Sequence, residues 1–148
     1  MSTEKLTQDE AKRLIDMLKR ALVSTVVFPS QGQGDEFDVV GDTKKDAFCI
    51  SIYRGRIQPL KYNLGARIKK NGTMLLELHV GQSLVHTNPD GEKINGTHWH
   101  VYTEGYGRSY AFPADSILSD QFVDNTIKFL EEFHVVEKPT VLYQVELI

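Results

Sequence analysis

Cysteine and long apolar runs are both scarce in this chain. Cys49 is the one cysteine among 148 residues, so an internal disulfide is excluded. Its place in the run Ala-Phe-Cys-Ile-Ser-Ile predicts that it packs as a small hydrophobic side chain. No apolar stretch approaches the ~20 residues of a membrane-spanning helix, and the first residues, Met-Ser-Thr-Glu-Lys, lead into charged residues instead of a signal-peptide core. We therefore expect a soluble, cytoplasmic protein with no membrane partner.

The size and composition of the chain fit one globular unit. Hydrophobic residues make up 41% of the sequence, enough for 148 residues to bury a core without disulfides or a structural metal. No internal repeat, low-complexity tract or linker divides the sequence. We therefore predict a single domain over residues 1–148.

Apolar residues recur at helical spacing in two segments. Thr7 and Glu10 have the spacing of a capping box, and the apolar positions that follow predict a first helix over about residues 8–24. A second helix is predicted over about residues 120–133, with Ser119 or Asp120 as its N-cap.

Between the helices the apolar residues alternate, which predicts strands. The predicted strands cover residues 37–40, 47–54, 61–69, 73–80, 98–104 and 141–148. Asn71 and Gly72 form a hairpin turn signal, so the strands on either side of it are expected to be antiparallel neighbours. The predicted fold is α+β, a largely antiparallel sheet of five or more strands with N- and C-terminal helices packed on one face.

The stretch His-Trp-His-Val-Tyr-Thr-Glu is the most informative part of the sequence. Side chains of a strand alternate between its two faces, so every second residue shares a face. One face then carries the polar residues His98, His100, Tyr102 and Glu104. By the same parity Trp99 is expected to be buried, with both histidines at least partly exposed.

A cationic run lies nearby in the sequence. Six cations and no acid occur between residues 54 and 70, so the rest of the chain carries the acidic excess behind its net charge of −3. The residues predicted to contact the phosphates of RNA or another polyanion are Arg54, Arg56, Lys61, Arg67 and Lys69. A solvated strand edge protected by cations is the alternative interpretation.

Two histidines beside cations could cleave RNA without a metal or other cofactor. In this hypothesis His98 and His100 act as acid and base, and Tyr102 or Glu104 orients an imidazole. Arginine or lysine side chains would stabilise the transition state, the candidates being Arg54, Arg67 and Lys69. The predicted activity is that of a metal-independent endoribonuclease.

A metal site and an interaction surface are the alternatives. His98-x-His100-x-x-x-Glu104 resembles the first metal motif of cupin barrels, and His86 could add a ligand from a loop shaped by Asn88 and Asp90. The cupin glycine six residues before the first histidine is replaced here by glutamate, and the second cupin motif is absent. Without a metal, the polar strand would be a contact surface for a partner, and the isolated His79 and His134 are expected to be structural.

Several motifs together resemble a family of small uncharacterised proteins of Gram-positive bacteria and their mobile elements. They are Arg-Gly-Arg-Ile from Arg54, Leu-Leu-Glu-Leu from Leu75, His-x-Asn-Pro-Asp-Gly from His86, and His-x-His-x-Tyr-x-Glu-Gly-Tyr from His98. The chain is more distantly similar to TumE-like toxins of toxin-antitoxin pairs, although Val85 replaces the proline of their Pro-His element. The second similarity implies a nuclease with an antitoxin as its protein partner.

Overall fold

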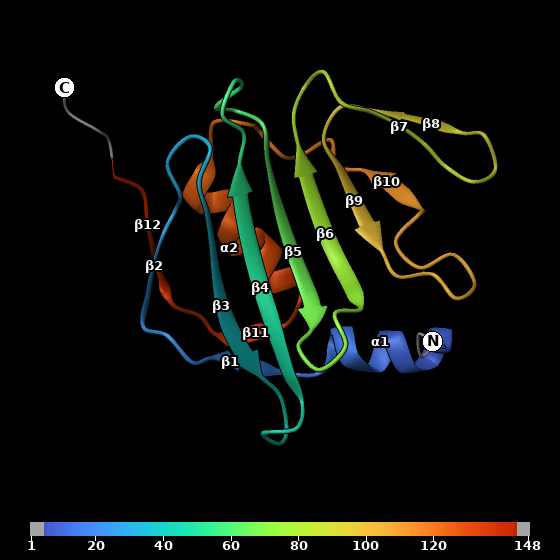
Figure 1. Ribbon diagram of the computed structural model, residues 1–148, viewed down its shortest axis with the longest axis vertical. Coiled ribbons are helices and arrows are strands. Elements are labelled where there is room, and N and C mark those ends of the chain that lie inside the picture. The colour runs from blue at the N-terminus through green and yellow to red at the C-terminus, as the bar shows by residue number, and fades with distance from the viewer. Residues whose placement is uncertain (1–4, 145–148) are drawn as a thin grey trace.

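The computed structural model describes residues 5–144, in which the chain forms two helices and twelve strands (Figure 1). The helices are α1 (Gln8–Asp16) and α2 (Phe122–Glu132). The strands are β1 (Lys19–Ala21), β2 (Thr25–Val27), β3 (Gly34–Val40), β4 (Ala47–Arg54), β5 (Tyr62–Ile68), β6 (Met74–Val80), β7 (Val85–Thr87), β8 (Lys93–Asn95), β9 (His98–Val101), β10 (Ala111–Pro113), β11 (Val135–Glu137) and β12 (Thr140–Leu142).

Within these described residues, eight strands form one sheet in the order β10-β9-β6-β5-β4-β3-β1-β11. Each neighbouring pair is antiparallel except β1 and β11, which are parallel. Strands β2 and β12 form a separate parallel pair, and β7 and β8 form a hairpin beside the edge strand β10. The α+β fold with a largely antiparallel sheet is therefore confirmed.

Helix α2 covers one face of the sheet, and its apolar side chains form the centre of the core (Figure 1). Phe129 stacks on Trp99 of β9 with the ring centroids 6.2 Å apart, and Phe133 meets Phe48 of β4 edge-on at 5.3 Å. Burial of each such side chain stabilises the fold by roughly 1.5–3 kcal/mol. The opposite face of the sheet, turned towards the viewer in Figure 1, is free of helices in the described chain.

Helix α1 crosses the end of the sheet (Figure 1) and begins with the predicted capping box between Thr7 and Glu10. The prediction that it continues to about residue 24 is wrong, because it ends at Asp16 and the chain enters strand β1. The reason lies in the next residues. Leu18, which fits the helical spacing, is 62% exposed, whereas Lys19 is buried with three hydrogen bonds to carbonyl oxygens.

The predicted and observed boundaries of the other elements agree where the sequence pattern is long. The strands predicted over residues 47–54, 61–69 and 73–80 are present to within one residue, and Gly72 adopts the positive φ of +78° that the predicted hairpin requires. The predicted N-cap of α2 is wrong, because Gln121 occupies that position without a side-chain hydrogen bond. The last predicted strand is limited to β12, and its residues 145–148 lie outside the described part.

No helix among the described residues is long and apolar enough to cross a membrane.

Candidate metal centre

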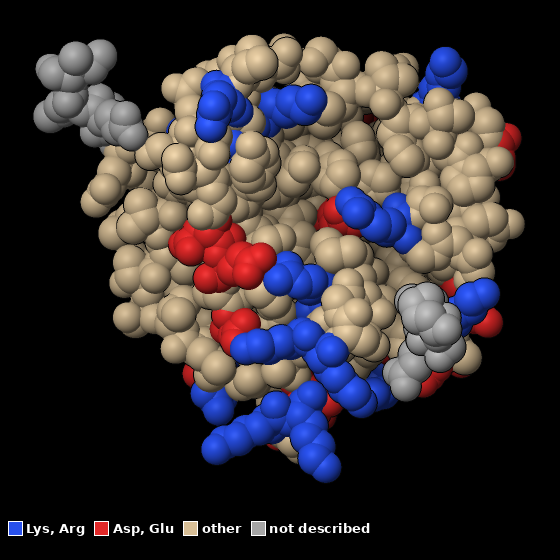
Figure 2. All heavy atoms as spheres, in the orientation of Figure 1, with Lys and Arg blue, Asp and Glu red and all other residues tan. Residues whose placement is uncertain are grey.

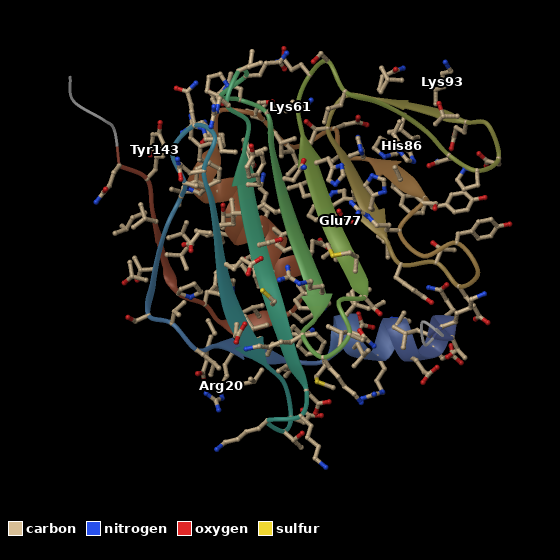
Figure 3. All side chains as sticks on the ribbon, viewed as in Figure 1. Arg20, Lys61, Glu77, His86, Lys93 and Tyr143 are labelled. Carbon is tan, nitrogen blue, oxygen red and sulfur yellow. The ribbon has the colours of Figure 1, made fainter. Side chains whose placement is uncertain are left out.

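Neighbouring strands β6 and β9 bring the predicted histidines next to a third one. In their antiparallel register His79 lies opposite His98, and Glu77 lies opposite His100. All four side chains are on the helix-free face, because the alternate residues of β6, such as Leu78, point into the core beneath α2. Figure 3 places Glu77 and His86 on this part of the sheet.

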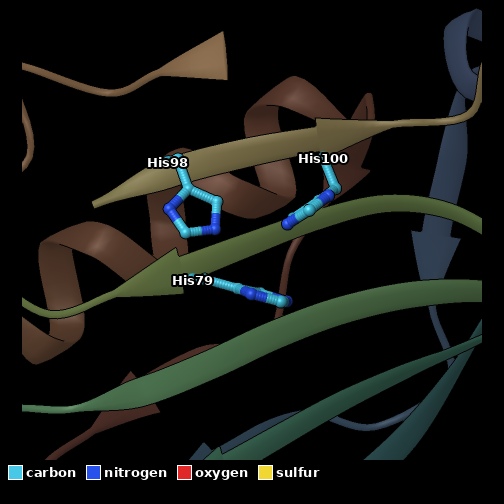
Figure 4. A group of neighbouring side chains, drawn as sticks. All are labelled: His79, His98 and His100. Carbon is cyan, nitrogen blue, oxygen red and sulfur yellow. The ribbon is translucent and has the colours of Figure 1, made fainter. Parts of the chain in front are cut away.

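His79, His98 and His100 converge on one point (Figure 4). One ring nitrogen from each residue lies within 4.8 Å of one ring nitrogen of each of the other two. Among the described residues, these three form the group of potential metal ligands that lie this close together. The ring centroids of His79 and His100 are 4.6 Å apart, and those of His98 and His100 are 4.9 Å apart. Tetrahedral zinc needs ligand nitrogens roughly 3.4 Å apart, so small shifts of the rings would let all three bind one metal ion.

Hydrogen bonds to the backbone fix the tautomers of two of the rings. Nδ1 of His98 lies 2.8 Å from the carbonyl oxygen of Gly96, and Nδ1 of His100 lies 2.7 Å from that of Arg108. A carbonyl oxygen can only accept, so Nδ1 carries the proton in both rings. The lone pair of Nε2 is then left free in each neutral imidazole.

The third ring is held by a carboxylate. Nε2 of His79 donates to Oε1 of Glu77 at 3.0 Å, which leaves Nδ1 of His79 with the free lone pair. Metal-binding histidines almost always donate their second N–H to a carboxylate or a carbonyl in this way, because the bond orients the ring and makes its lone pair more basic. All three rings of this histidine cluster therefore have the hydrogen bonding of metal ligands.

Burial keeps two rings of the cluster, those of His98 and His100, uncharged. His98 is 3% exposed and His100 is 5% exposed, and this burial lowers the pKa of His98 and lowers the pKa of His100 to about 4. Both imidazoles are thus neutral near pH 7, the form that binds a metal.

The predicted parity of the strand is confirmed. Its predicted exposure is wrong, since Trp99 is half-buried against α2 and both histidines are buried, with the ring of His86 from β7 beside them.

A buried carboxylate next to the cluster has one oxygen without a partner. Oε1 of Glu77 accepts hydrogen bonds from His79 and from the guanidinium of Arg108. Oε2 of Glu77 has no partner among the described residues, a state it shares with Oδ1 of Asn125 in the core. Burial favours the protonated acid, but the His79 hydrogen bond and the Arg108 charge together keep the pKa of Glu77 below its ordinary value. Glu77 is therefore a buried anion with spare acceptor capacity.

The loop that was predicted to bring His86 near the strand does so. The ring centroid of His86 lies 4.7 Å from that of His100, and its Nε2 donates to the carbonyl of Ser109 at 2.8 Å. Asn88 is buried and pairs with both backbone groups of Ala111 on β10, at 2.7 and 3.0 Å, which fixes the β7–β8 hairpin. Asp90 only shapes the turn by accepting from the backbone of Glu92.

Tyr102 and Glu104 do not join the histidines. Strand β9 ends at Val101, so the alternation that would have placed them on the same face stops there. The hydroxyl of Tyr102 donates to the carbonyl of Leu6, and the carboxylate of Glu104 accepts from the backbone N–H of Gln8 at the start of α1. Their predicted role in orienting an imidazole, and the cupin-like position of Glu104, therefore have no support in the geometry.

The basic run is divided by the fold into three groups. Arg54 is buried, donates to the carbonyl of Pro59 and lies 4.4 Å above the ring of Phe122. The guanidinium of Arg67 pairs with Glu36 at 3.0 Å, and Lys69 pairs with Asp38. Cations and acids accordingly lie side by side on this face (Figure 2).

The third group of cations, Arg56 and Lys61, is exposed and has no ion pair among the described residues. These two side chains are the members of the predicted phosphate-binding set that remain available for an anionic ligand.

Sequence reasoning missed three residues of the site. His79 was expected to be structural, and Glu77 and Arg108 were given no role. The hairpin signal at residues 71–72 and the parity of β6 do place Glu77 and His79 on the polar face. The pairing of β6 with β9 then brings His98 and His100 next to these two residues, and no turn signal in the sequence specifies that pairing.

Fold and site together define an α+β protein with a cluster of three histidines, two of them buried. The chain belongs to a family of unknown function (DUF6978), whose model matches residues 6–135. No curated protein and no solved structure matches the chain.

Proposed function

We propose that His79, His98 and His100 bind one divalent transition-metal ion, with zinc as the preferred candidate. The observation that carries this proposal is the convergence of three imidazoles, each of which has one ring nitrogen hydrogen-bonded and the other left free. Three histidines are the ligands of one common type of catalytic zinc site, in which the fourth position holds water or substrate. Imidazole also suits copper, nickel and iron, so selectivity is part of the test.

The reaction class that this arrangement supports is metal-assisted hydrolysis. A bound metal makes its water ligand more acidic and a better nucleophile at neutral pH. The free Oε2 of Glu77 is an acceptor that could orient such a water, and Arg108 holds the carboxylate in place. In the hydrolytic step the water oxygen bonds to the electrophilic atom, the bond to the leaving group breaks, and the water proton passes to the leaving group.

Metal-independent cleavage of RNA by His98 and His100 stays a hypothesis that the geometry supports less well. An acid-base pair needs one imidazole that is protonated near neutral pH, and burial lowers the pKa of His100 to about 4. Cleavage of RNA by a metal-bound water uses the same residues without this difficulty.

A calorimetric titration of the chelator-treated protein with zinc tests the metal site. We expect one zinc ion per chain for the wild type and a loss of binding in His79→Ala and His98→Ala. His134→Asn is the matched control, because it removes a histidine outside the cluster and asparagine tolerates the positive φ of 59° found there. Wild-type protein that binds no zinc, or cluster variants that bind as well as the control, would overturn the proposal.

Incubation with labelled RNA separates the two hydrolytic hypotheses. Cleavage that is lost with chelator and restored by zinc supports hydrolysis at the metal. Cleavage that survives chelator but is absent in His98→Ala and His100→Ala supports the acid-base mechanism. Zinc binding with no cleavage of RNA leaves the metal site in place and assigns it another substrate.

A further inference from the structure

A row of polar side chains runs across the helix-free face to the histidine cluster. Tyr53 of β4 is the cross-strand partner of Asn63 on β5, which is opposite His79 on β6, which is in turn opposite His98 on β9. Partners directly opposite in antiparallel strands share a face, so these residues form one line. Since neighbouring strands lie about 4.8 Å apart, Tyr53 is roughly 10 Å from His79.

A cavity of about 360 Å³ opens at the Tyr53 end of this row. Its lining includes Tyr53 and Asn63 from the row and Arg56, Ile57 and Lys61 from the loop that joins β4 to β5. Figure 3 shows Lys61 at the upper end of the face on which Glu77 and His86 lie lower down. The cavity and the candidate metal centre thus lie at two ends of one row of side chains on the same face of the sheet.

The cavity combines unpaired positive charge with exposed apolar surface. Arg56 and Lys61 have no ion pair within residues 5–144, whereas Arg67 and Lys69 on the same face are neutralised by acids. Tyr53 is 52% exposed and Ile57 is 90% exposed. Cations beside an aromatic ring are the features with which proteins hold an unstacked base and its phosphate.

We propose that this cavity binds one nucleotide of a single-stranded nucleic acid, whose chain continues over Asn63 to the histidine cluster. The base packs against Tyr53 and Ile57, and a phosphate lies between Arg56 and Lys61. The continuation towards the cluster rests on the proposed function, whereas binding in the cavity does not.

The distance along the row distinguishes this ligand from a smaller one. Lys61 lies two residues before Asn63, which is one strand spacing from His79, so a phosphate held at Lys61 is roughly 8 Å from His79 and cannot also reach the metal. A ligand with phosphates at regular intervals can occupy both places. A duplex fits the cavity poorly, because its bases are stacked and paired and cannot turn towards Tyr53.

Fluorescence anisotropy with a short labelled oligouridine tests the proposal, with chelator present so that metal-dependent cleavage is prevented. We expect affinity to fall as salt rises, and to fall about tenfold in Tyr53→Ala and in the double variant Arg56→Ala/Lys61→Ala. The double variant Arg67→Ala/Lys69→Ala is the matched control. It also removes two positive charges from this face. We expect its affinity to stay within about twofold of the wild type because Arg67 and Lys69 are already paired with acids.

The same measurement on His79→Ala keeps the two proposals apart. If this variant has lost zinc binding but keeps its RNA affinity, the cavity binds RNA independently of the metal centre. No binding to the wild type at low salt would overturn the nucleotide site. So would an equal loss in both double variants, which indicates unspecific attraction, or equally strong competition by free uridine monophosphate or by duplex RNA.

Discussion

Lys19 and the histidine cluster are both buried polar groups, yet their hydrogen bonding differs. The ammonium of Lys19 donates to three carbonyl oxygens, those of Ile15, Met17 and Phe133, each at 2.8 Å. In the cluster each histidine uses one nitrogen and leaves the other free, and Oε2 of Glu77 has no partner among the described residues. Burial of a polar group without a partner costs free energy, so a fully bonded group fits a structural role and an incompletely bonded one fits a ligand site.

The largest effect is expected at Lys19. It satisfies the last turns of both helices, and its Nζ lies 3.8 Å from the ring centroid of Phe133. Lys19→Met should lower the free energy of unfolding by about 4 kcal/mol, because the buried carbonyls of Met17 and Phe133 lose this donor and that of Ile15 keeps only His134. Urea denaturation measures this change.

Lys12→Met is the control, since Lys12 pairs with Asp16 at the exposed surface of α1, where water screens the pair, and should leave stability nearly unchanged. Zinc stoichiometry should be unchanged in both lysine variants. A loss below about 1 kcal/mol in Lys19→Met would show that its hydrogen bonds are not the structural support described.

Zinc should stabilise the protein by the next largest amount. A ligand that binds the folded state alone, at a concentration one hundred times its Kd, raises the free energy of unfolding by about 2.7 kcal/mol. Thermal unfolding with and without zinc should show the increase in Tm for the wild type and for His134→Asn. His98→Ala should show no increase, and an equal shift in that variant would mean that zinc binds elsewhere.

The sequence predicted the polar face more reliably than the site on it. Alternation within β4, β5 and β6 is a local property of the chain, so their residues and the turn between β5 and β6 were correct. The histidine cluster depends on β9 pairing with β6, and on the β7–β8 hairpin that Asn88 fixes to β10. These are tertiary choices that periodicity does not encode.

The end of β9 shows the same limit at one residue. Alternation predicted that Tyr102 and Glu104 share the face of the histidines. The side chain of Gln8, far away in sequence, accepts from the backbone N–H of Glu104, while Glu104 accepts from that of Gln8, both at 2.8 Å. This reciprocal contact with α1 redirects the chain after Val101. Helical spacing was misleading at Lys19 for a similar reason, since its partner Phe133 is remote in sequence.

Glu77→Gln should have a smaller effect, confined to the metal site. The amide keeps the shape and can still accept from His79, but it removes the negative charge beside the cluster. Loss of such a supporting carboxylate weakens metal affinity by about tenfold, or ~1.4 kcal/mol. Zinc calorimetry measures the loss. Glu36→Gln, which alters an exposed carboxylate on the same face, should bind zinc as the wild type does, and equal weakening in both variants would argue against a specific role for Glu77.

The smallest effect on stability is expected where polar groups on the helix-free face of the sheet are paired and exposed. Arg67 and Glu36 are an ion pair at 3.0 Å with much of the glutamate side chain in solvent, so water screens their attraction. Arg67→Ala should therefore cost about 0.5 kcal/mol of stability in urea denaturation, less at high salt, and leave zinc affinity unchanged. This pair is hydrogen-bonded, as Lys19 is, but it is not buried. A loss as large as that of Lys19→Met would mean that pairing alone, without burial, decides which polar groups support the fold.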